Sequence, residues 1–345
     1  MFCFNSDYTE GAHEKLLDAL IRTNMEQTVG YGEDQYCMEA AQAIKNACNR
    51  QDVYVQFLVG GTQTNLTVIS AALRTHQGVL SANSGHIGVH ETGAIEATGH
   101  KVLSIPSPDG KITAEQVRDV VEAHYNDATH EHIVQPKMVY ISNPTELGTI
   151  YSKDELEALR KVCDEKNLYL FMDGARLGYG LASRENNLTL EMLCNFCDVF
   201  YIGGTKVGAL FGEAVVITNE ALKQDFRYIM KQHGALLAKG RLLGVQFLTL
   251  FTDDLYFEIS KHAIRMADKL RDGLNKMGVE WLVNSPTNQM FPILEDRVLK
   301  QLDKNYIYSY QERIDKNRSA IRFCTSWATK EEAVDCLLKD LEEYI

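Results

Sequence analysis

The residues best suited to carry chemistry lie just after predicted apolar strands. Lys206 follows the run 199–203, and apolar residues 207–211 come after it, so the pKa of its amine can fall and the amine can act as a nucleophile. Asp173 closes a second apolar run, 169–173. An acid in that place can point into a ligand crevice, although it can equally cap the next turn. The sequence thus offers an amine and a carboxylate at strand ends.

A glycine pair and a histidine follow two other predicted strands. Gly60 and Gly61 stand between a strand and a helix, where the backbone can approach an anion and the helix N-terminus offers free N–H groups. Thr62 or Thr64 could add a hydroxyl donor. A simple turn is the alternative, and no Gly-Lys-Ser/Thr follows that would make this a P-loop. His86 comes after the next strand and proves nothing alone.

These residues can form one site only in a fold that brings the ends of several strands together. The sequence pattern predicts such a fold. Short β-branched runs alternate with amphipathic stretches, a pattern that favours βαβ units with a mostly parallel sheet flanked by helices. Ligands bind such sheets at the carboxyl ends of the strands. The predicted strands are 53–58, 78–81, 101–105, 138–142, 169–173, 199–203 and 214–218. The predicted helices are 64–75, 90–98, 113–125, 152–166 and 189–195.

The pattern changes after residue 219, where longer helical stretches take over. Helices are predicted over 220–232, 239–252, 255–277 and 330–343, with strands over 279–282, 290–294 and 320–325. This second part has antiparallel character and predicts a smaller C-terminal α/β domain. We therefore expect an N-terminal arm over residues 1–30, a large domain over 31–245 and a small domain over 246–345.

Composition excludes several classes of protein. The net charge of −12 disfavours a nucleic-acid partner, since basic clusters would have to stand out from a net anion. No run reaches the ~18 apolar residues of a membrane span, and the first residues do not resemble a signal peptide, so we expect a cytoplasmic protein. Cys194 and Cys197 have the spacing of zinc ligands but lack a partner pair, so two core thiols are expected and no metal site.

The order of the four features resembles that of pyridoxal-phosphate enzymes of the aspartate-aminotransferase type, fold type I. In those enzymes a glycine loop holds the phosphate, a His stacks on the ring, an Asp holds the proton of the pyridine nitrogen, and a Lys forms the Schiff base. Here Lys206 follows Asp173 by 33 residues, as in that layout. The resemblance therefore implies pyridoxal 5'-phosphate as the cofactor.

Within fold type I the chain resembles the threonine aldolase and β-eliminating lyase family over nearly its whole length. Asp173-Gly174-Ala175-Arg176 matches the family's Asp-Gly-Ala-Arg motif without a change. The resemblance places Lys206 on the Schiff-base lysine and His86 on the ring-stacking histidine, with Glu91 on a family Glu five residues further on. It also places Gly61 and Thr62 in the phosphate loop, and makes Arg176 a binding residue for both cofactor and substrate.

The same resemblance names residues for the substrate and for a neighbouring subunit. Ser6 matches the Ser of the family's Arg-Ser-Asp-Thr opening, which helps to hold the substrate carboxylate, and Arg322 matches a second carboxylate-binding Arg. Tyr31 falls on the Tyr of the family's Tyr-Gly-Glu-Asp segment, which reaches the active site of a neighbouring subunit. This implies a homodimer or homotetramer.

Three family segments are altered. The family's Leu-Ser-Lys-Gly is replaced around Lys206, which is preceded here by Gly-Gly-Thr and followed by Val-Gly. The segment Glu-Asn-Thr-His-Asn-Gly appears here as Asn-Pro-Thr-Glu-Leu-Gly, 143–148, without its His. The segment Gly-Gly-Gly-Met-Arg-Gln has lost its Arg in 233–240, where Lys239 or Arg241 could supply the charge near the phosphate.

The resemblance implies a lyase that splits a β-hydroxy-α-amino acid, L-threonine or L-allo-threonine, into glycine and an aldehyde. A base must take the β-hydroxyl proton; His86 is the first candidate, His132 the second and water the third. The alternatives are a β-eliminating lyase or an aminotransferase on the same scaffold, or a non-catalytic protein that keeps the fold.

Overall fold

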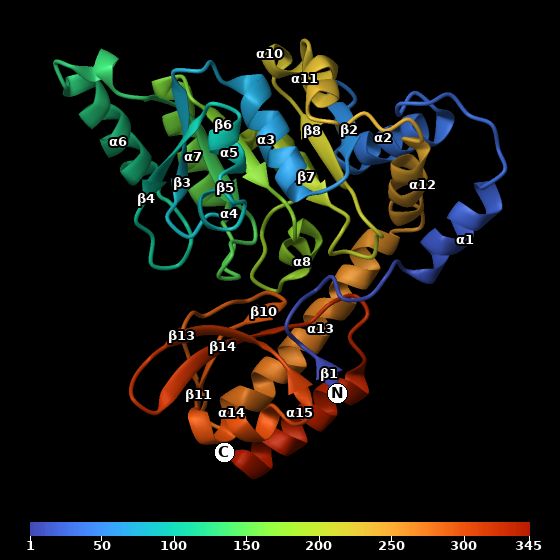
Figure 1. Cartoon of the computed structure of the whole chain (residues 1–345), viewed down its shortest axis with the longest axis vertical. Coiled ribbons are helices and arrows are strands. Elements are labelled where there is room, and N and C mark those ends of the chain that lie inside the picture. The colour runs from blue at the N-terminus through green and yellow to red at the C-terminus, as the bar shows by residue number, and fades with distance from the viewer.

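The computed structural model describes all of residues 1–345, in which the long helix α13 (Leu255–Lys276) runs from a larger unit into a smaller one (Figure 1). The larger unit is built on one seven-stranded sheet of order β2-β8-β7-β6-β5-β3-β4. Strand β8 runs antiparallel to the other six, which all point the same way. The strands are β2 (Tyr54–Leu58), β3 (Gln77–Ala82), β4 (Lys101–Ile105), β5 (Gln135–Ser142), β6 (Tyr169–Asp173), β7 (Val199–Gly203) and β8 (Glu213–Ile217).

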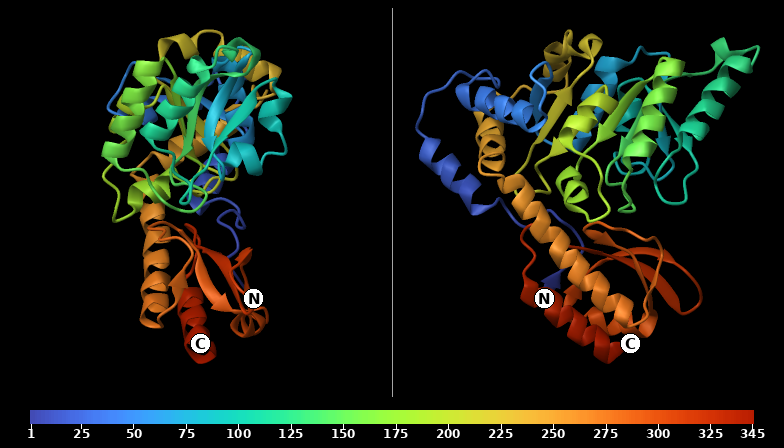
Figure 2. Two further views of the ribbon diagram at one scale, coloured as in Figure 1. Left: turned by 90° about the vertical axis from the view of Figure 1, so that its left-hand side faces the viewer. Right: turned by 180° about the vertical axis from the view of Figure 1, so that it is seen from behind.

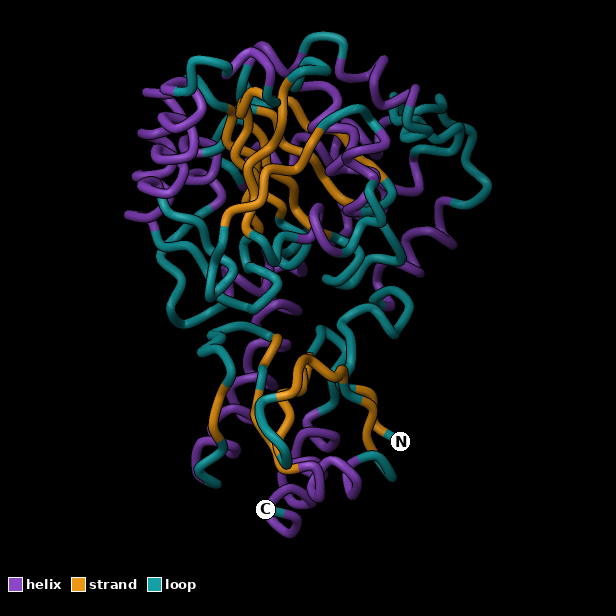
Figure 3. The backbone as a smooth tube through the Cα atoms, turned by 60° about the vertical axis from the view of Figure 1, so that its left-hand side comes forward, coloured by secondary structure: helices purple, strands orange, loops and turns teal.

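The central strands are apolar throughout because both faces of the sheet are covered. In β5, Val139 and Ile141 pack into one core while Met138 and Tyr140 pack into the other, as the two-residue period of a strand requires. Figure 3 shows helices around the strands of this sheet. The predicted sheet, mostly parallel and flanked by helices, is confirmed.

Two sets of helices form the layers of the larger unit (Figure 2). One face of the sheet is covered by α2 (Gln35–Ala47), α6 (Ala114–Asn126), α7 (Lys153–Lys166), α9 (Leu190–Phe196) and α12 (Arg241–Leu250). The other is covered by α3 (Gly61–Ala72), α4 (His86–Val89), α5 (Ala94–Ala97), α10 (Glu220–Lys223) and α11 (Phe226–Gln232). Helix α7 begins at a capping box in which Ser152 and Glu155 satisfy each other's backbone N–H groups.

The smaller unit combines α13 with an antiparallel sheet and two further helices. Its strands are β9 (Glu280–Trp281), β10 (Gln289–Met290), β11 (Pro292–Glu295), β13 (Ser309–Arg313) and β14 (Arg318–Cys324), and its helices are α14 (Asp296–Leu302) and α15 (Glu331–Tyr344). The N-terminal strand β1 (Phe2–Cys3) pairs here with β12 (Tyr306–Ile307), and Phe4 joins the core of this unit. The chain start therefore lies beside the C-terminal part.

The structure differs from the sequence prediction at two short segments that follow strands of the large sheet. The helix predicted over 90–98 is replaced by the short helices α4 and α5, because Thr92 and Gly93 between them have φ of 54° and 73°. Helix α8 (Leu177–Ala182) was not predicted, since its sequence Leu-Gly-Tyr-Gly-Leu-Ala contains two helix-weakening glycines. Residue 246 falls inside α12, and the predicted domain boundaries stay a prediction.

The chain contains no helix with both the length and the apolar character of a membrane span. The remaining N-terminal helix, α1 (Glu14–Thr23), packs along α12.

Candidate active site

The carboxyl ends of the parallel strands surround a cavity of about 310 Å³. Its walls come from the ends of β5, β6 and β7, the residues after β2, β3, β5, β6 and β7, the start of β8, and the N-terminal segment at Tyr8. This is where open α/β sheets bind their ligands. The lining residues are Tyr8, Val59, Gly60, Gly61, Thr62, His86, Ser142, Pro144, Glu146, Asp173, Ala175, Arg176, Tyr201, Thr205, Lys206 and Glu213.

Asp173 stands at the end of β6 as a buried carboxylate with both oxygens hydrogen-bonded. Its Oδ2 accepts hydrogen bonds from the Tyr140 hydroxyl at 2.6 Å and the Asn65 amide at 3.1 Å, and its Oδ1 accepts the Ala175 N–H at 3.0 Å. Burial alone would raise the pKa of Asp173, but the bonds from Tyr140, Tyr201 and Ala175 outweigh it and lower the pKa. Asp173 is therefore an anion at neutral pH.

His86 begins α4 and is held by a buried acid. Its Nδ1 lies 2.8 Å from Oε1 of Glu91, which also accepts the Asn65 amide at 2.7 Å. Burial lowers the pKa of His86, but the Glu91 hydrogen bond and the charges of Asp173 and Glu91 raise it overall. The ring is thus fixed in orientation and biased toward its protonated form, and Asn65 links it to Asp173.

Lys206 follows β7 on a tightly bonded turn. Its backbone carbonyl accepts the Tyr179 hydroxyl at 2.5 Å. Burial and the charge of Arg176 lower the pKa of the Lys206 amine, which makes the neutral, nucleophilic form more available. Beside it, Glu213 is 3% exposed, and burial raises its pKa to about 8. Glu213 accepts the Thr205 hydroxyl on Oε1 at 2.9 Å and the Gly204 N–H on Oε2 at 3.1 Å.

The start of α3 is shaped to receive an anion. The helix begins after Gly60 without any side-chain cap, so its first N–H groups are left for a ligand. A Cβ added to Gly61 would lie 3.2 Å from the Tyr201 hydroxyl, a tight contact. Thr62 lines the cavity, whereas Thr64, the other proposed hydroxyl donor, is buried and does not.

The guanidinium of Arg176 forms a bidentate ion pair with Asp7 of the N-terminal segment. Its Nε donates to Oδ2 of Asp7 at 2.6 Å and its Nη2 donates to Oδ1 at 3.0 Å, while Asn288 adds a bond to Oδ2 at 2.9 Å. The Asp7 side chain is completely buried and that of Arg176 is 12% exposed. The bidentate edge of the guanidinium is therefore occupied by Asp7, and Nη1 is left for a ligand in the cavity.

This buried ion pair should contribute to stability. Burial tends to raise the pKa of Asp7, but the charges of Arg176 and Lys206 lower it overall. We expect Asp7→Asn to lower the free energy of unfolding by about 3 kcal/mol at neutral pH, because an arginine is left without its counter-charge. A carboxyl group whose pKa is lower in the folded than in the unfolded protein stabilises the fold at pH values above its unfolded pKa. The destabilisation caused by Asp7→Asn should therefore shrink as the pH falls below the usual pKa range of aspartate.

Urea unfolding at several pH values measures this effect, with Asp18→Asn on the exposed face of α1 as the control. Equal stability of Asp7→Asn and the wild type at neutral pH would show that the pair contributes nothing.

Ser6 and Arg322 lie beside the same N-terminal segment. The Ser6 hydroxyl is buried and has no hydrogen-bond partner. Arg322 on β14 donates from Nη2 to the Asn5 carbonyl at 2.9 Å and from Nη1 to Oε1 of Gln289 at 3.2 Å, and its buried Nε is unpaired. Neither residue lines the cavity itself. Two donors without an acceptor, the Ser6 hydroxyl and the Arg322 Nε, thus lie close in the chain or in space to Asp7 and Tyr8.

The structure does not bring His132 to the cavity. It lies exposed in a 3-10 turn, His130–His132, that precedes β5. The cavity residue Ser142 closes β5 at the opposite edge of the sheet. With about 3.3 Å per strand residue, the length of β5 separates the two. The second candidate for the base is therefore corrected: His132 does not line the cavity of its own chain.

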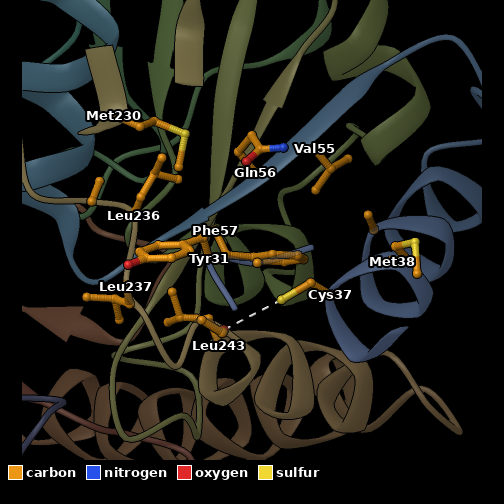
Figure 4. A pocket seen from close by; sticks show the side chains of 14 residues that line it. Tyr31, Cys37, Met38, Val55, Gln56, Phe57, Met230, Leu236, Leu237 and Leu243 are labelled. Carbon is orange, nitrogen blue, oxygen red and sulfur yellow. Dashed lines mark hydrogen bonds between the residues drawn. The ribbon is translucent and has the colours of Figure 1, made fainter. Parts of the chain in front are cut away.

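Tyr31 borders a different, mainly apolar pocket of about 120 Å³ (Figure 4). Phe57 and Leu237 line the same pocket, and the ammonium of Lys231 stands 4.8 Å from the centroid of the Tyr31 ring. The side chain is 46% exposed. Tyr31 does not line the cavity of its own chain.

Neither basic residue proposed as a charge near the phosphate lines the strand-end cavity. Arg241 donates to the Thr23 carbonyl at 2.7 Å and the Asn24 carbonyl at 3.2 Å, and Lys239 is exposed. Within this chain, Arg241 instead ties α12 to the end of α1.

The sequence alone assigns no role to several residues at the site. Glu146 belongs to a segment that departs from the family pattern, and Asp7 belongs to the opening motif. Tyr140 could have been found from the strand period, because it shares a face with Ser142 at the end of β5. Glu213 gave a weak signal, as an acid that opens an otherwise apolar strand.

Comparisons with known proteins agree with this arrangement. The family model described as β-eliminating lyase matches residues 4–297. A low specificity L-threonine aldolase of Pseudomonas aeruginosa is 30% identical over 353 residues, covering 98% of this chain and 96% of the relative. A solved structure of a Leishmania major threonine aldolase is 46% identical, with a TM-score of 0.97 over 99% of both chains.

A more distant match adds support for the fold alone. A double mutant of Thermus thermophilus aspartate aminotransferase has a TM-score of 0.72 at 16% identity, over 100% of this chain and 92% of that one. The predicted fold class is thereby confirmed, as is the resemblance stated above. The chain belongs to the β-eliminating lyase family and has the architecture of fold type I pyridoxal-phosphate enzymes.

Proposed function

We propose that this protein is a pyridoxal-phosphate-dependent lyase that cleaves L-threonine or L-allo-threonine into glycine and acetaldehyde. One observation carries the proposal: the Lys206 amine and the anionic Asp173 line one cavity together with the uncapped start of α3. The similarity to threonine aldolases supports the choice of substrate. Bound pyridoxal phosphate would supply an electron sink for the pair released when a bond to Cα breaks.

The residues present fit that cofactor. Lys206 would form the Schiff base, since its amine lies in the cavity with a lowered pKa. Asp173 would hold the proton of the pyridine nitrogen, and His86 would stack on the ring. The N–H groups of Gly61 and Thr62 would hold the phosphate, because they open a helix that lacks a cap.

The substrate carboxylate would be held by Ser6, Arg176 and Arg322. Asp7 fixes the guanidinium of Arg176, so its free Nη1 can donate without losing orientation. The Ser6 hydroxyl and the Arg322 Nε have no hydrogen-bond acceptor within the chain. Buried donors without an acceptor are expected where an anionic ligand binds. A fixed carboxylate sets the rotation about Cα and hence which of its bonds breaks.

Product analysis separates this proposal from its alternatives. Protein loaded with pyridoxal phosphate is incubated with L-threonine, and acetaldehyde, glycine, ammonia and 2-oxo acids are measured. Acetaldehyde and glycine in equal amounts are expected. Ammonia with 2-oxobutanoate would indicate β-elimination, dependence on an added 2-oxo acid would indicate an aminotransferase, and no turnover would indicate a non-catalytic protein.

We also propose that the active form is a homodimer or homotetramer with Tyr31 reaching a neighbour's site. Support comes from exposed apolar side chains around α1 and α2: Ile21, Met25, Val29 and Met38 are each more than 60% exposed. Exposed apolar side chains that follow one another closely along the chain suit a symmetric contact between subunits. The cytoplasm is the proposed compartment, because all eight cysteines are free.

Mixing two inactive variants tests the shared site. Lys206→Ala and Tyr31→Phe are combined under conditions in which tagged subunits are shown to exchange. We expect partial recovery of activity, because some mixed dimers carry one site with both native residues. If both parents are inactive, exchange is confirmed and no activity returns, then Tyr31 does not act across a subunit boundary.

A further inference from the structure

One carboxylate in the cavity, Glu146, has no part in the scheme above. Its Oε1 accepts the Ser142 hydroxyl at 2.7 Å and the backbone N–H of His86 at 3.0 Å. These two bonds fix the carboxylate between the end of β5 and the start of α4. Its Oε2 accepts no hydrogen bond from the chain, although the residue lines the cavity. Glu146 thus offers one anchored oxygen and one free one.

The surroundings of Glu146 make it a stronger base than an exposed glutamate. Burial raises its pKa, the Ser142 hydrogen bond opposes this, and the negative charge of Asp173 adds to the rise. The positive charge of His86 acts in the opposite direction without cancelling the shift. A carboxylate with a raised pKa is a stronger base and accepts a proton more readily.

The other titratable groups of the cavity are less suited to accept a proton. Asp173 is bound by three donors, and both oxygens of Glu213 are hydrogen-bonded. His86 has a raised pKa and directs Nδ1 at Glu91, so its ring is biased toward a form that has no free lone pair. Lys206 is committed to the cofactor. Among the three carboxylates that line the cavity, only Glu146 has an oxygen that accepts no hydrogen bond from the chain.

We infer that Glu146 is the catalytic base that removes the β-hydroxyl proton of the substrate, an inference that rests on the proposed function. The Glu146 carboxylate takes the proton, and the O–H electron pair becomes the second bond of the aldehyde carbonyl. The Cα–Cβ bond breaks, and its electron pair stays with the glycine fragment. That fragment then takes up one proton at Cα, so glycine and aldehyde together balance the substrate.

Glu146→Gln tests this role, because the amide keeps the shape of the carboxylate but cannot take the proton. We expect L-threonine cleavage by the loaded enzyme to fall about 100-fold or more, the usual scale for loss of a general base. Exchange of the glycine α-proton with D2O needs no β-hydroxyl base and should stay within about threefold of wild type. The dissociation constant for pyridoxal phosphate, followed by absorbance, should also stay within about threefold.

Two further variants sharpen the test. Glu146→Asp keeps the carboxylate but retracts it, so its cleavage rate should lie between those of wild type and Glu146→Gln; this variant also serves if the amide fails to fold. Glu157→Gln, on the exposed face of α7, is the matched control and should match wild type.

The outcomes separate this inference from the function on which it rests. Equal losses of cleavage and of proton exchange in Glu146→Gln would show that Glu146 only positions the cofactor, and would overturn the inference. Unchanged cleavage would also overturn it and would point to His86 or water. A wild-type enzyme that exchanges glycine protons but does not cleave threonine would refute the proposed function itself.

Discussion

Replacing Lys206 by Ala is expected to remove the long-wavelength absorbance band of the loaded protein and to lower the turnover of L-threonine at least about 1,000-fold. Lys206 is the lysine in the cavity, and no other amine in its lining could form the Schiff base. Loss of a nucleophile that acts with its neighbours as a unit costs this much or more. Absorbance spectra and acetaldehyde release measure the two effects.

Borohydride reduction of the wild type and peptide mapping give the complementary result. The pyridoxyl group should be found on Lys206, and Lys161→Ala on the exposed face of α7 should leave spectrum and turnover unchanged. Label on a different lysine would remove Lys206 from its assigned role.

Asp173→Asn should retain the cofactor but lower turnover about 100-fold, which corresponds to about 2.7 kcal/mol in the barrier. The amide can still accept the Tyr140 hydrogen bond, but it has no negative charge with which to hold a proton on the pyridine nitrogen. The loss should therefore exceed the ~1 kcal/mol of an ordinary hydrogen bond. Turnover and the absorbance of bound cofactor are measured on the same samples.

Tyr140→Phe is the matched control, because it removes a hydrogen bond to Asp173 but leaves the negative charge of Asp173 in place. It removes one donor to Oδ2 but leaves Asp173 ionised through Asn65, Tyr201 and the Ala175 N–H. Its turnover should fall about tenfold at most, the scale of one hydrogen bond. Near-normal activity in a folded Asp173→Asn protein would show that the charge of Asp173 does not act on the ring.

The sequence was sufficient to find the strand-end residues of the site. Strands β6 and β7 are buried on both faces, so their apolar runs end abruptly where Asp173 and the turn to Lys206 begin. In a parallel sheet those ends share one edge, which is why residues far apart in the chain could be placed together. Gly61 could be placed at the same site because it stands between a predicted strand and a predicted helix.

The long-range partners of those residues could not be found in the same way. Asp7 and Arg176 lie 169 positions apart, and nothing local in either segment indicates that they pair. The ring of His86 is linked through Glu91 and Asn65 to Asp173 only because α3 crosses above β6. Such contacts depend on the packing of whole elements, which residue spacing alone does not specify.

His132 shows how position in the chain can mislead. The resemblance placed a family histidine near it, but the residue precedes β5 and the site follows that strand. Glu146, which follows β5, stands instead at the cavity edge of the sheet. Because a strand carries the chain from one edge of a sheet to the other, the side of a strand on which a residue falls decides whether it can reach the site.

The most direct test of the account is the fate of the Cα–Cβ bond of the substrate. L-Threonine labelled with ¹³C at every carbon is incubated with the loaded wild-type protein and followed by ¹³C NMR. The account predicts that the labelled chain separates into two two-carbon products, glycine and acetaldehyde, which form at equal rates. A labelled product that keeps the bond between the original Cα and Cβ, such as 2-oxobutanoate formed with release of ammonia, would contradict it.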